Sequence, residues 1–298
     1  MEITTLIENT TRDATLVPEH GLSLHIRALG RNLLFDMGAS RKFLQNAHTL
    51  GVNLRTVDKA VVSHAHYDHG GGLGFFLSFN TGAKVYLGPE AHGDYYANIG
   101  TRLPVVLLPV VYPWIHSSRF FLRAIGLDGT VLDQYADRIH LLTGDTQIHD
   151  HIFLLTSIDR KYPLAEGNKF LLKKERGRMQ PDRFSHELIM VIREPDGLVV
   201  FTGCGHSGIL NIISTVRKAF VDQAIKGIVG GFHLALQPHK PGIAGKREDI
   251  LGIAEALLTL GVRKVFTGHC TGSAAFAILK DRMGDRIEQL YTGIRFDL

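Results

Sequence analysis

The feature that most constrains this chain is the stretch SHAHYDHGGG at residues 63–72, where three histidines and one aspartate fall within six residues. Imidazole and carboxylate groups bind zinc, and also iron or manganese when oxygen ligands are added. On a turn that leaves a strand, His64 and His66 can bind one metal ion, while Asp68 and His69 reach a second. A solvated histidine-rich turn is the alternative, but this spacing after the apolar run at 60–62 favours a metal site.

A related theme recurs three more times along the chain. An apolar strand, glycine and a histidine-bearing turn combine at His206, His233 and His269, as they do at His64. In layered α/β folds, ligand sites form beyond the ends of the strands. We therefore expect these four turns to converge on one cleft.

The turns supply further candidates for this cleft. His206 and His269 are the best distant metal ligands. Cys204 is either a metal-binding or metal-bridging side chain or a small buried residue. His233 could bind metal, move a proton or hold an anion, and we favour a role that faces the substrate.

The sequence leaves the roles of three other acidic and histidine side chains open. Asp182 and His186 lie just before the apolar strands expected at 188–192 and 198–202, and they are candidates for the same site. Asp36 ends the apolar stretch 32–38. It is either a surface turn residue or the partner that orients a metal-binding histidine through a hydrogen bond.

Composition narrows the class of protein. With 298 residues, 45% of them hydrophobic and 21% charged, the chain can form one large globular domain or two small ones. Two cysteines, Cys204 and Cys270, argue against a disulfide scaffold, and the start of the chain lacks the build of a signal peptide, so we expect a cytoplasmic protein. The net charge of +4 favours an anionic ligand, whereas no basic run suggests nucleic acid and no apolar run suggests a membrane span.

Two middle segments are harder to interpret. Residues 88–138 carry aromatic side chains that are either core or part of a lid or insertion over the site: Tyr95, Tyr96, Trp114, Phe120 and Phe121. Residues 159–183 are rich in lysine and arginine, which indicates either a solvated basic loop or a flexible arm that meets an anionic substrate. The residues between the strands expected at 138–142 and 151–157 form a turn.

Two metal ions with an open position imply a hydrolytic type of chemistry. They lower the pKa of a bound water so that hydroxide forms near neutral pH, and they polarise a phosphoryl or carbonyl oxygen. Asp68 could also orient that water. The sequence contains no Gly-x-Ser-x-Gly elbow, Walker A loop or dinucleotide fingerprint.

These motifs resemble a known family. The stretch 63–71 is similar to the signature of the metallo-β-lactamase superfamily, and five further motifs resemble its dihydropterin synthase-like branch: EHGLS at 19–23, LFDMG at 34–38, TGCGHSGI at 202–209, GGFHL at 230–234 and GHCTG at 268–272. The resemblance implies an α/β fold, a four-layer αββα sandwich, in a single domain over residues 1–298. It also implies that His64, His66, Asp68 and His69 bind metal and that His269 completes the set.

The chain departs from the superfamily pattern in two places. Many members have an aspartate where this chain has Cys204, and many have a histidine in a Gly-His context where this chain has residues 182–186. The ligand set of the second metal is therefore open, and His206 is a candidate to compensate.

The resemblance implies a binuclear metalloenzyme, with zinc as the favoured ion and iron or manganese as alternatives. We expect a hydrolase that acts on a phosphorylated, anionic small molecule through a metal-bound hydroxide, with Asp68 and His233 as catalytic groups and His20, His186 and Asp182 as substrate-binding ones. A dihydropterin synthase-like condensation that releases pyrophosphate is the alternative, and a metal-dependent sensing module with little turnover is another. Homo-oligomerisation stays open.

Overall fold

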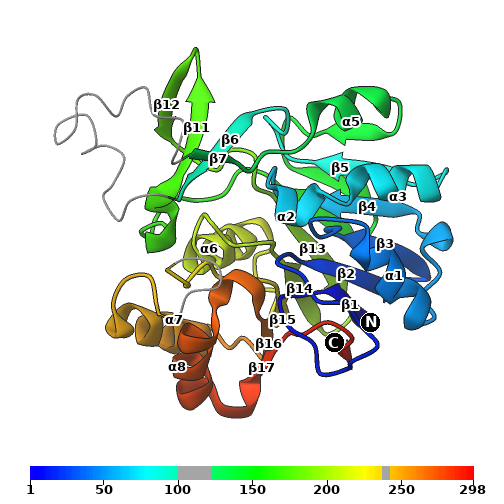
Figure 1. Cartoon of the computed structure of the whole chain (residues 1–298). Coiled ribbons are helices and arrows are strands. Elements are labelled where there is room, and N and C mark those ends of the chain that lie inside the picture. Colours follow the sequence, from blue (N-terminus) through cyan, green and yellow to red (C-terminus); the bar gives the residue numbers. More distant parts are fainter. Residues whose placement is uncertain (100–121, 237–241) are drawn as a thin grey trace.

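Two β-sheets form the centre of the molecule. The computed structural model describes residues 1–99, 122–236 and 242–298, and its two large sheets have the strand orders β18-β1-β2-β3-β4-β5-β8 and β17-β16-β15-β14-β13-β10-β9 (Figure 1). The strands of the first sheet are β1 (Glu2–Ile7), β2 (Ser23–Ala28), β3 (Arg31–Phe35), β4 (Lys59–Val62), β5 (Lys84–Leu87), β8 (Ile139–Leu141) and β18 (Arg295–Asp297). Those of the second are β9 (Thr146–His149), β10 (Ile152–Leu155), β13 (Ile189–Glu194), β14 (Gly197–Phe201), β15 (Ile225–Val229), β16 (Lys264–Thr267) and β17 (Ile287–Gln289).

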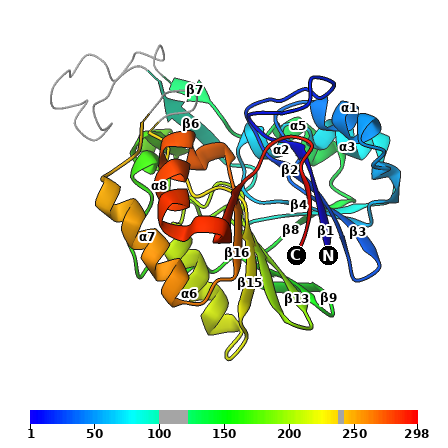
Figure 2. The same cartoon turned by 90° about the horizontal axis from the view of Figure 1, so that it is seen from below.

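Helices cover the outer face of each sheet. The helices of the described residues are α1 (Lys42–Thr49), α2 (Tyr67–Gly70), α3 (Leu73–Phe79), α5 (Gly129–Gln134), α6 (Ile209–Ala219), α7 (Arg247–Thr259) and α8 (Ser273–Met283), with short 3-10 turns η1 (Leu54–Thr56), η5 (Glu166–Phe170), η6 (His269–Thr271) and η7 (Gly284–Arg286). Figure 2 shows α6, α7 and α8 on one side of the paired sheets and α1 and α3 on the other. The four-layer αββα arrangement predicted from the sequence is confirmed.

The central strands are apolar on both faces because both faces are buried. Successive side chains of a strand point to opposite sides of the sheet. In β14, Leu198 and Val200 pack against the helices, whereas Val199 and Phe201 pack against the other sheet. Strands buried on both sides read as continuous hydrophobic runs, which is why the apolar stretches of the sequence predicted these strands.

A third, smaller sheet lies in the segments that were hard to interpret. It has the strand order β12-β11-β6-β7, with β6 (Asp94–Asn98), β7 (Leu122–Ala124), β11 (Leu171–Glu175) and β12 (Arg178–Pro181), and Figure 1 shows it at the top of the view. The stretch 159–183 is therefore not the loop that its basic residues suggested, since β11 and β12 form an antiparallel pair within it. Tyr95 is buried and packs in the core. Trp114, Phe120 and Phe121 lie outside the described residues.

The histidine motifs follow the ends of parallel strands. β14, β15 and β16 run parallel to one another in the second sheet, so their carboxyl ends meet at one edge. β4, in the first sheet, ends at Val62, two residues before His64. Within the described ranges, no helix is long and apolar enough to cross a membrane.

His25 gives the fold a measurable pH dependence. His25 lies on β2 and pairs in register with Leu34 of β3. It faces the helix side of the sheet and is 5% exposed. Burial, with help from Arg27, lowers its pKa from 6.5 to about 4. Between these two pH values the unfolded chain binds a proton that the folded chain does not, so His25 makes the folded protein less stable as the pH falls from 6.5 to 4.

The variant His25→Gln cannot titrate, so it isolates this effect. We expect the free energy of unfolding of the variant to increase relative to that of the wild type when the pH is lowered from 7 to 4. The expected increase is on the order of 3 kcal/mol. Urea unfolding of both proteins at a series of pH values measures the shift. A difference that stays constant with pH would show that His25 titrates alike in both states.

Candidate metal centre

The four histidine turns meet at one place. The ring centroids of His64 and His206 lie 4.9 Å apart, those of His69 and His269 also 4.9 Å, and those of His206 and His233 4.2 Å. These side chains follow strands of both large sheets, and His69 and His269 are 200 residues apart in the chain. The convergence expected from the strand-end theme is confirmed.

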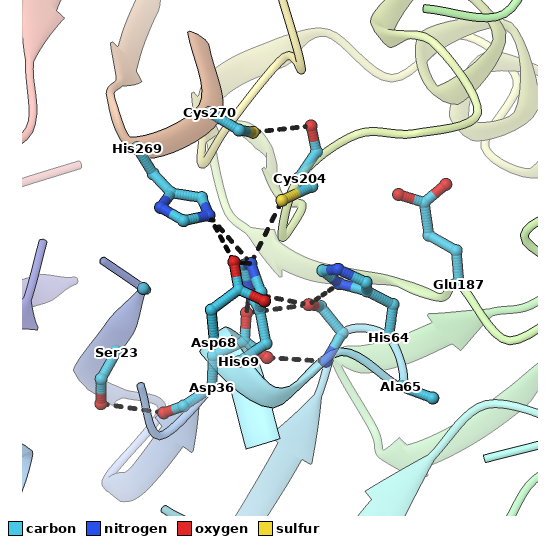
Figure 3. Close-up of polar contacts among 12 residues, drawn as sticks. Ser23, Asp36, His64, Ala65, Asp68, His69, Glu187, Cys204, His269 and Cys270 are labelled. Carbon is cyan, nitrogen blue, oxygen red and sulfur yellow. Dashed lines mark hydrogen bonds and ion pairs between the residues drawn. The ribbon is translucent and has the colours of Figure 1, made fainter. Parts of the chain in front are cut away.

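One group of four side chains points inward from three of these turns. His69 Nε2 lies 3.1 Å from His269 Nε2 and 3.2 Å from Cys204 Sγ (Figure 3). Asp68 Oδ2 lies 3.3 Å from His269 Nε2 and 3.7 Å from His69 Nε2. All four side chains are buried, and their ligand atoms are close enough together to hold one metal ion.

Hydrogen bonds on the far side of each ring leave these inward atoms as acceptors. His69 Nδ1 lies 2.6 Å from Asp36 Oδ2, and the carboxylate can only accept, so the ring carries its proton there. His269 Nδ1 lies 3.0 Å from Oδ1 of Asn9, whose amide nitrogen donates to the carbonyl of His269. Two imidazole lone pairs and a carboxylate oxygen then face one another beside the Cys204 sulfur, an arrangement that a cation would stabilise.

A second group shares Cys204 with the first. His64, Cys204 and His206 also place their ligand atoms close enough for one metal ion. Ser63 Oγ donates its hydrogen bond to Asp36, so it accepts one from His64 Nδ1 at 2.9 Å. The proton of the His64 ring is therefore on Nδ1, and Nε2 carries a free lone pair. His66 is adjacent, with its ring centroid 4.5 Å from that of His64 and its Nε2 buried and without a hydrogen bond.

Asn168 fixes the orientation of His206. Its amide nitrogen donates to the His206 carbonyl at 2.7 Å, and its oxygen lies 2.9 Å from His206 Nδ1. His206 Nδ1 therefore carries the proton, and Nε2 is buried without a partner. The donor set of both groups, imidazole, thiol and carboxylate, fits divalent zinc, so the residues present fit the metal that the sequence predicts.

The electrostatics of the histidines favour metal binding. Burial lowers the pKa of His64, His66 and His206, that of His66 to about 3, so these rings are neutral near neutral pH. His69 differs, because the carboxylates of Asp36 and Asp68 outweigh the effect of burial and raise its pKa. A proton on His69 and a metal ion therefore compete for the same position.

Buried carboxylates hold the backbone of two of the turns. Glu187 accepts from the backbone N–H groups of His206 at 2.7 Å and Ser207 at 2.8 Å. Glu8 accepts from the backbone N–H of His269 in the same way. Burial raises the pKa of both glutamates, and the hydrogen bonds from the two turns act in the opposite direction. Glycine is needed where the turns touch, since a Cβ at Gly203 would lie 2.0 Å from Ser63 Oγ.

His186 is placed differently from the other histidines. Its Nδ1 accepts from the backbone N–H of Ala65 at 3.0 Å, so its Nε2 carries the proton and donates to Asp182 Oδ2 at 3.0 Å. Both ring nitrogens are therefore used within the protein. Asp182 and His186 lie behind His66 and are absent from the described lining of the cavity, so their predicted contact with substrate has no support from their position.

The two candidate metal-binding groups open into a cavity of about 330 Å³. His233 and His20 line it together with His66, Asp68, His206 and His269. His20 Nε2 lies 3.3 Å from Asp68 Oδ2, where it can steer that carboxylate. Although burial opposes it, contacts with His69, His20 and His269 hold the pKa of Asp68 well below its usual range.

Several residues of the site were not predicted from the sequence. Asn9, Asn168, Glu8 and Glu187 carry no motif of their own and reach the turns only through the fold. Asp36, by contrast, was one of the two interpretations left open, and the structure confirms that it orients a histidine of the cluster rather than lying on the surface.

Replacing Asp36 by asparagine should weaken metal binding while preserving the fold. Asparagine tolerates the left-handed backbone at this position (φ 58°), and its oxygen can still accept from the Ser63 N–H. Its NH₂ group would then face His69 Nδ1 and push the ring proton to Nε2, where the lone pair is needed. We expect the affinity for one metal equivalent to fall about 10- to 100-fold, measured by competition with a chromogenic chelator.

Unfolding of the same variant in excess chelator provides the control for this experiment. A similar metal-free stability with weakened metal binding would support the orienting role of Asp36. Unchanged affinity for every metal equivalent would contradict it.

Comparison with known proteins agrees with this geometry. Residues 18–269 match the family described as the metallo-beta-lactamase superfamily. The 7,8-dihydropterin-6-methyl-4-(beta-D-ribofuranosyl)-aminobenzene-5'-phosphate synthase of Methanocaldococcus jannaschii is 28% identical over 284 residues, which are 92% of this chain and 88% of that protein. Tm1679, described as a metal-dependent hydrolase of the beta-lactamase superfamily, is 29% identical with a TM-score of 0.79, over 100% of this chain and 99% of that one.

A more distant structure shares the fold alone. Zn²⁺-bound PqqB from Methylobacterium extorquens has a TM-score of 0.56 at 11% identity, with 100% of both chains covered. Together with the match over residues 18–269, these similarities establish that the chain belongs to the metallo-β-lactamase superfamily.

Proposed function

We propose that the chain is a metalloenzyme with two divalent ions, preferably zinc, that acts on the phosphoryl group of an anionic small molecule. His64, His66 and His206 would hold one ion, and Asp68, His69 and His269 the other, with Cys204 between them. The observation that carries the proposal is the meeting of two groups of possible metal ligands at Cys204, directly beside a cavity of about 330 Å³.

Hydrolysis of a phosphoester is the reaction that this arrangement supports best. Ions bound there would make water nucleophilic near neutral pH and withdraw charge from the phosphoryl oxygens. Asp68, whose carboxylate stays ionised, would orient the attacking water. His233 stands on the cavity wall, with its ring 4.2 Å from that of His206, and donates a proton to the oxygen of the leaving group.

A condensation that releases pyrophosphate is the second candidate, and one specific observation favours it. The relative from Methanocaldococcus jannaschii that covers 92% of this chain carries the name of a synthase. The same ions would neutralise the charge on a departing pyrophosphate. In that case an aromatic amine, instead of water, attacks the carbon that carries the pyrophosphate, and the carbon–oxygen bond breaks.

The assignment of His206 as a ligand can be tested against His186 with matched variants. Asparagine keeps a polar group near the position of Nδ1 in both side chains and removes Nε2. We expect His206→Asn to lose one of two bound metal equivalents and His186→Asn to keep both, as measured by elemental analysis of the purified proteins. Two equivalents in His206→Asn, or a loss confined to His186→Asn, would contradict the assignment.

The proposed activity can be tested on aryl and alkyl phosphoesters. We expect phosphate ester cleavage that chelation abolishes and zinc restores. His233→Gln should lower kcat about 100-fold for a poor alkyl leaving group and much less for nitrophenol, which needs no proton. Equal losses on both substrates would exclude His233 as the acid.

A further pair of assays separates the candidate functions. Release of pyrophosphate that depends on an added aromatic amine would favour the condensation over hydrolysis. Full metal occupancy without turnover in either assay would indicate a ligand-binding module instead of an enzyme.

A further inference from the structure

The third sheet forms one wall of the cavity. Leu171 of β11 pairs with Ala97 of β6, and Ala97 pairs with Arg123 of β7, so these three residues form a row across the sheet. Paired residues of neighbouring strands point to the same face. All three line the cavity, so this face of the sheet is turned toward the metal centre.

This wall, which we call the roof, is mostly apolar, with Arg123 as its charged side chain and Asn98 as a further polar residue. Its other members are Ile99, Ile125 and Phe170, and Ile99 is 61% exposed. Arg123 is the only lysine or arginine among the described residues that line the cavity. Over the described ranges no carboxylate lies within ion-pair distance of it, so its charge is not neutralised by the protein there.

A stacking contact holds the guanidinium near the metal-binding turn. Arg123 Cζ lies 4.9 Å from the centre of the Tyr67 ring, and Tyr67 stands between His66 and Asp68 in the chain. The guanidinium also donates a hydrogen bond to the Tyr67 hydroxyl. Its remaining N–H groups are available for a planar anion such as a carboxylate or phosphate. The arginine is thus positioned in advance, at little cost in side-chain freedom.

We infer that the cavity selects a substrate with two anionic ends, in which the phosphoryl group lies at the metal centre, a flat apolar body lies under the roof, and a second carboxylate or phosphate pairs with Arg123. This inference rests on the proposed function, because it takes the phosphoryl end of the substrate from it. It explains why one cation stands on a wall that is otherwise suited to an aromatic or aliphatic body.

Binding of unreactive phosphonates to the zinc-loaded protein tests the inference without turnover. The probes are phenylphosphonate, 4-carboxyphenylphosphonate and 1,4-phenylenediphosphonate, and calorimetry gives their dissociation constants. We expect the second anionic group to tighten binding about threefold to tenfold in the wild type. Comparison of the last two probes shows whether the roof prefers a carboxylate or a phosphate-like group.

Two variants separate anion binding from packing. Arg123→Gln should remove the gain from the second anion and leave the affinity for phenylphosphonate within about twofold. Arg55→Gln is the matched control, since Arg55 stacks on Phe79 at 4.3 Å in a similar way but does not line the cavity. It should keep the full gain.

The possible failures are distinguishable. Absence of phenylphosphonate binding in the wild type, or binding that chelation does not affect, would overturn the proposed function and the inference together. Chelation-sensitive binding of phenylphosphonate with no gain from the second anion would overturn the inference alone. The inference would also be overturned if Arg123→Gln kept the gain in affinity from the second anion. An equal loss of affinity for all three probes would overturn it as well, and would show that Arg123 is a packing residue.

Discussion

The buried carboxylate of Asp36 is the interaction on which the metal centre depends. One oxygen accepts from the Ser63 backbone N–H at 2.7 Å, and the other accepts from Ser63 Oγ at 2.8 Å and from His69 Nδ1 at 2.6 Å. Through Ser63 the same carboxylate sets the proton on His64. One side chain at the end of β3 therefore turns a lone pair inward in each of the two ligand groups.

This arrangement has an energetic consequence for the protein without metal. A buried charge is costly unless it is paired, and here the carboxylate of Asp68 faces the inward nitrogens of His69 and His269. The raised pKa of His69 is the response of the protein in that state, because a proton supplies part of the missing positive charge. A bound cation would take over that role, so metal binding and the stability of this edge of the sheets are coupled. Glu8 and Glu187 add to this arrangement, because they hold the backbone of the His269 and His206 turns.

The sequence predicted the elements better than the contacts between them. The turns at His64, His206, His233 and His269 were recognised because strand, glycine and histidine are local in the chain, and strand ends of an α/β fold meet at one edge. Local patterns could not predict that Asn9 lies against His269, 260 residues away, or that Asn168 orients His206. Nor could they predict that both ring nitrogens of His186 form hydrogen bonds, one with Ala65 and one with Asp182. The hairpin within 159–183 was missed because its charged strands are half solvated and lack an apolar run.

The division of the molecule into frame and roof explains how one centre can serve different reactions. The frame, by which we mean Asp36, Glu8, Glu187 and the turns that they hold, belongs to the two large sheets. It fixes the positions where metal ions and a phosphoryl group would meet. The roof belongs to the third sheet, which packs against the first sheet through the buried Tyr95, and its residues Ala97, Arg123 and Leu171 line the cavity. In the proposed function the two large sheets supply the same ligand groups for both candidate reactions, so the residues under the roof would decide whether water or an amine attacks. Substrate choice can therefore change through the third sheet without disturbing the hydrogen bonds of Asp36.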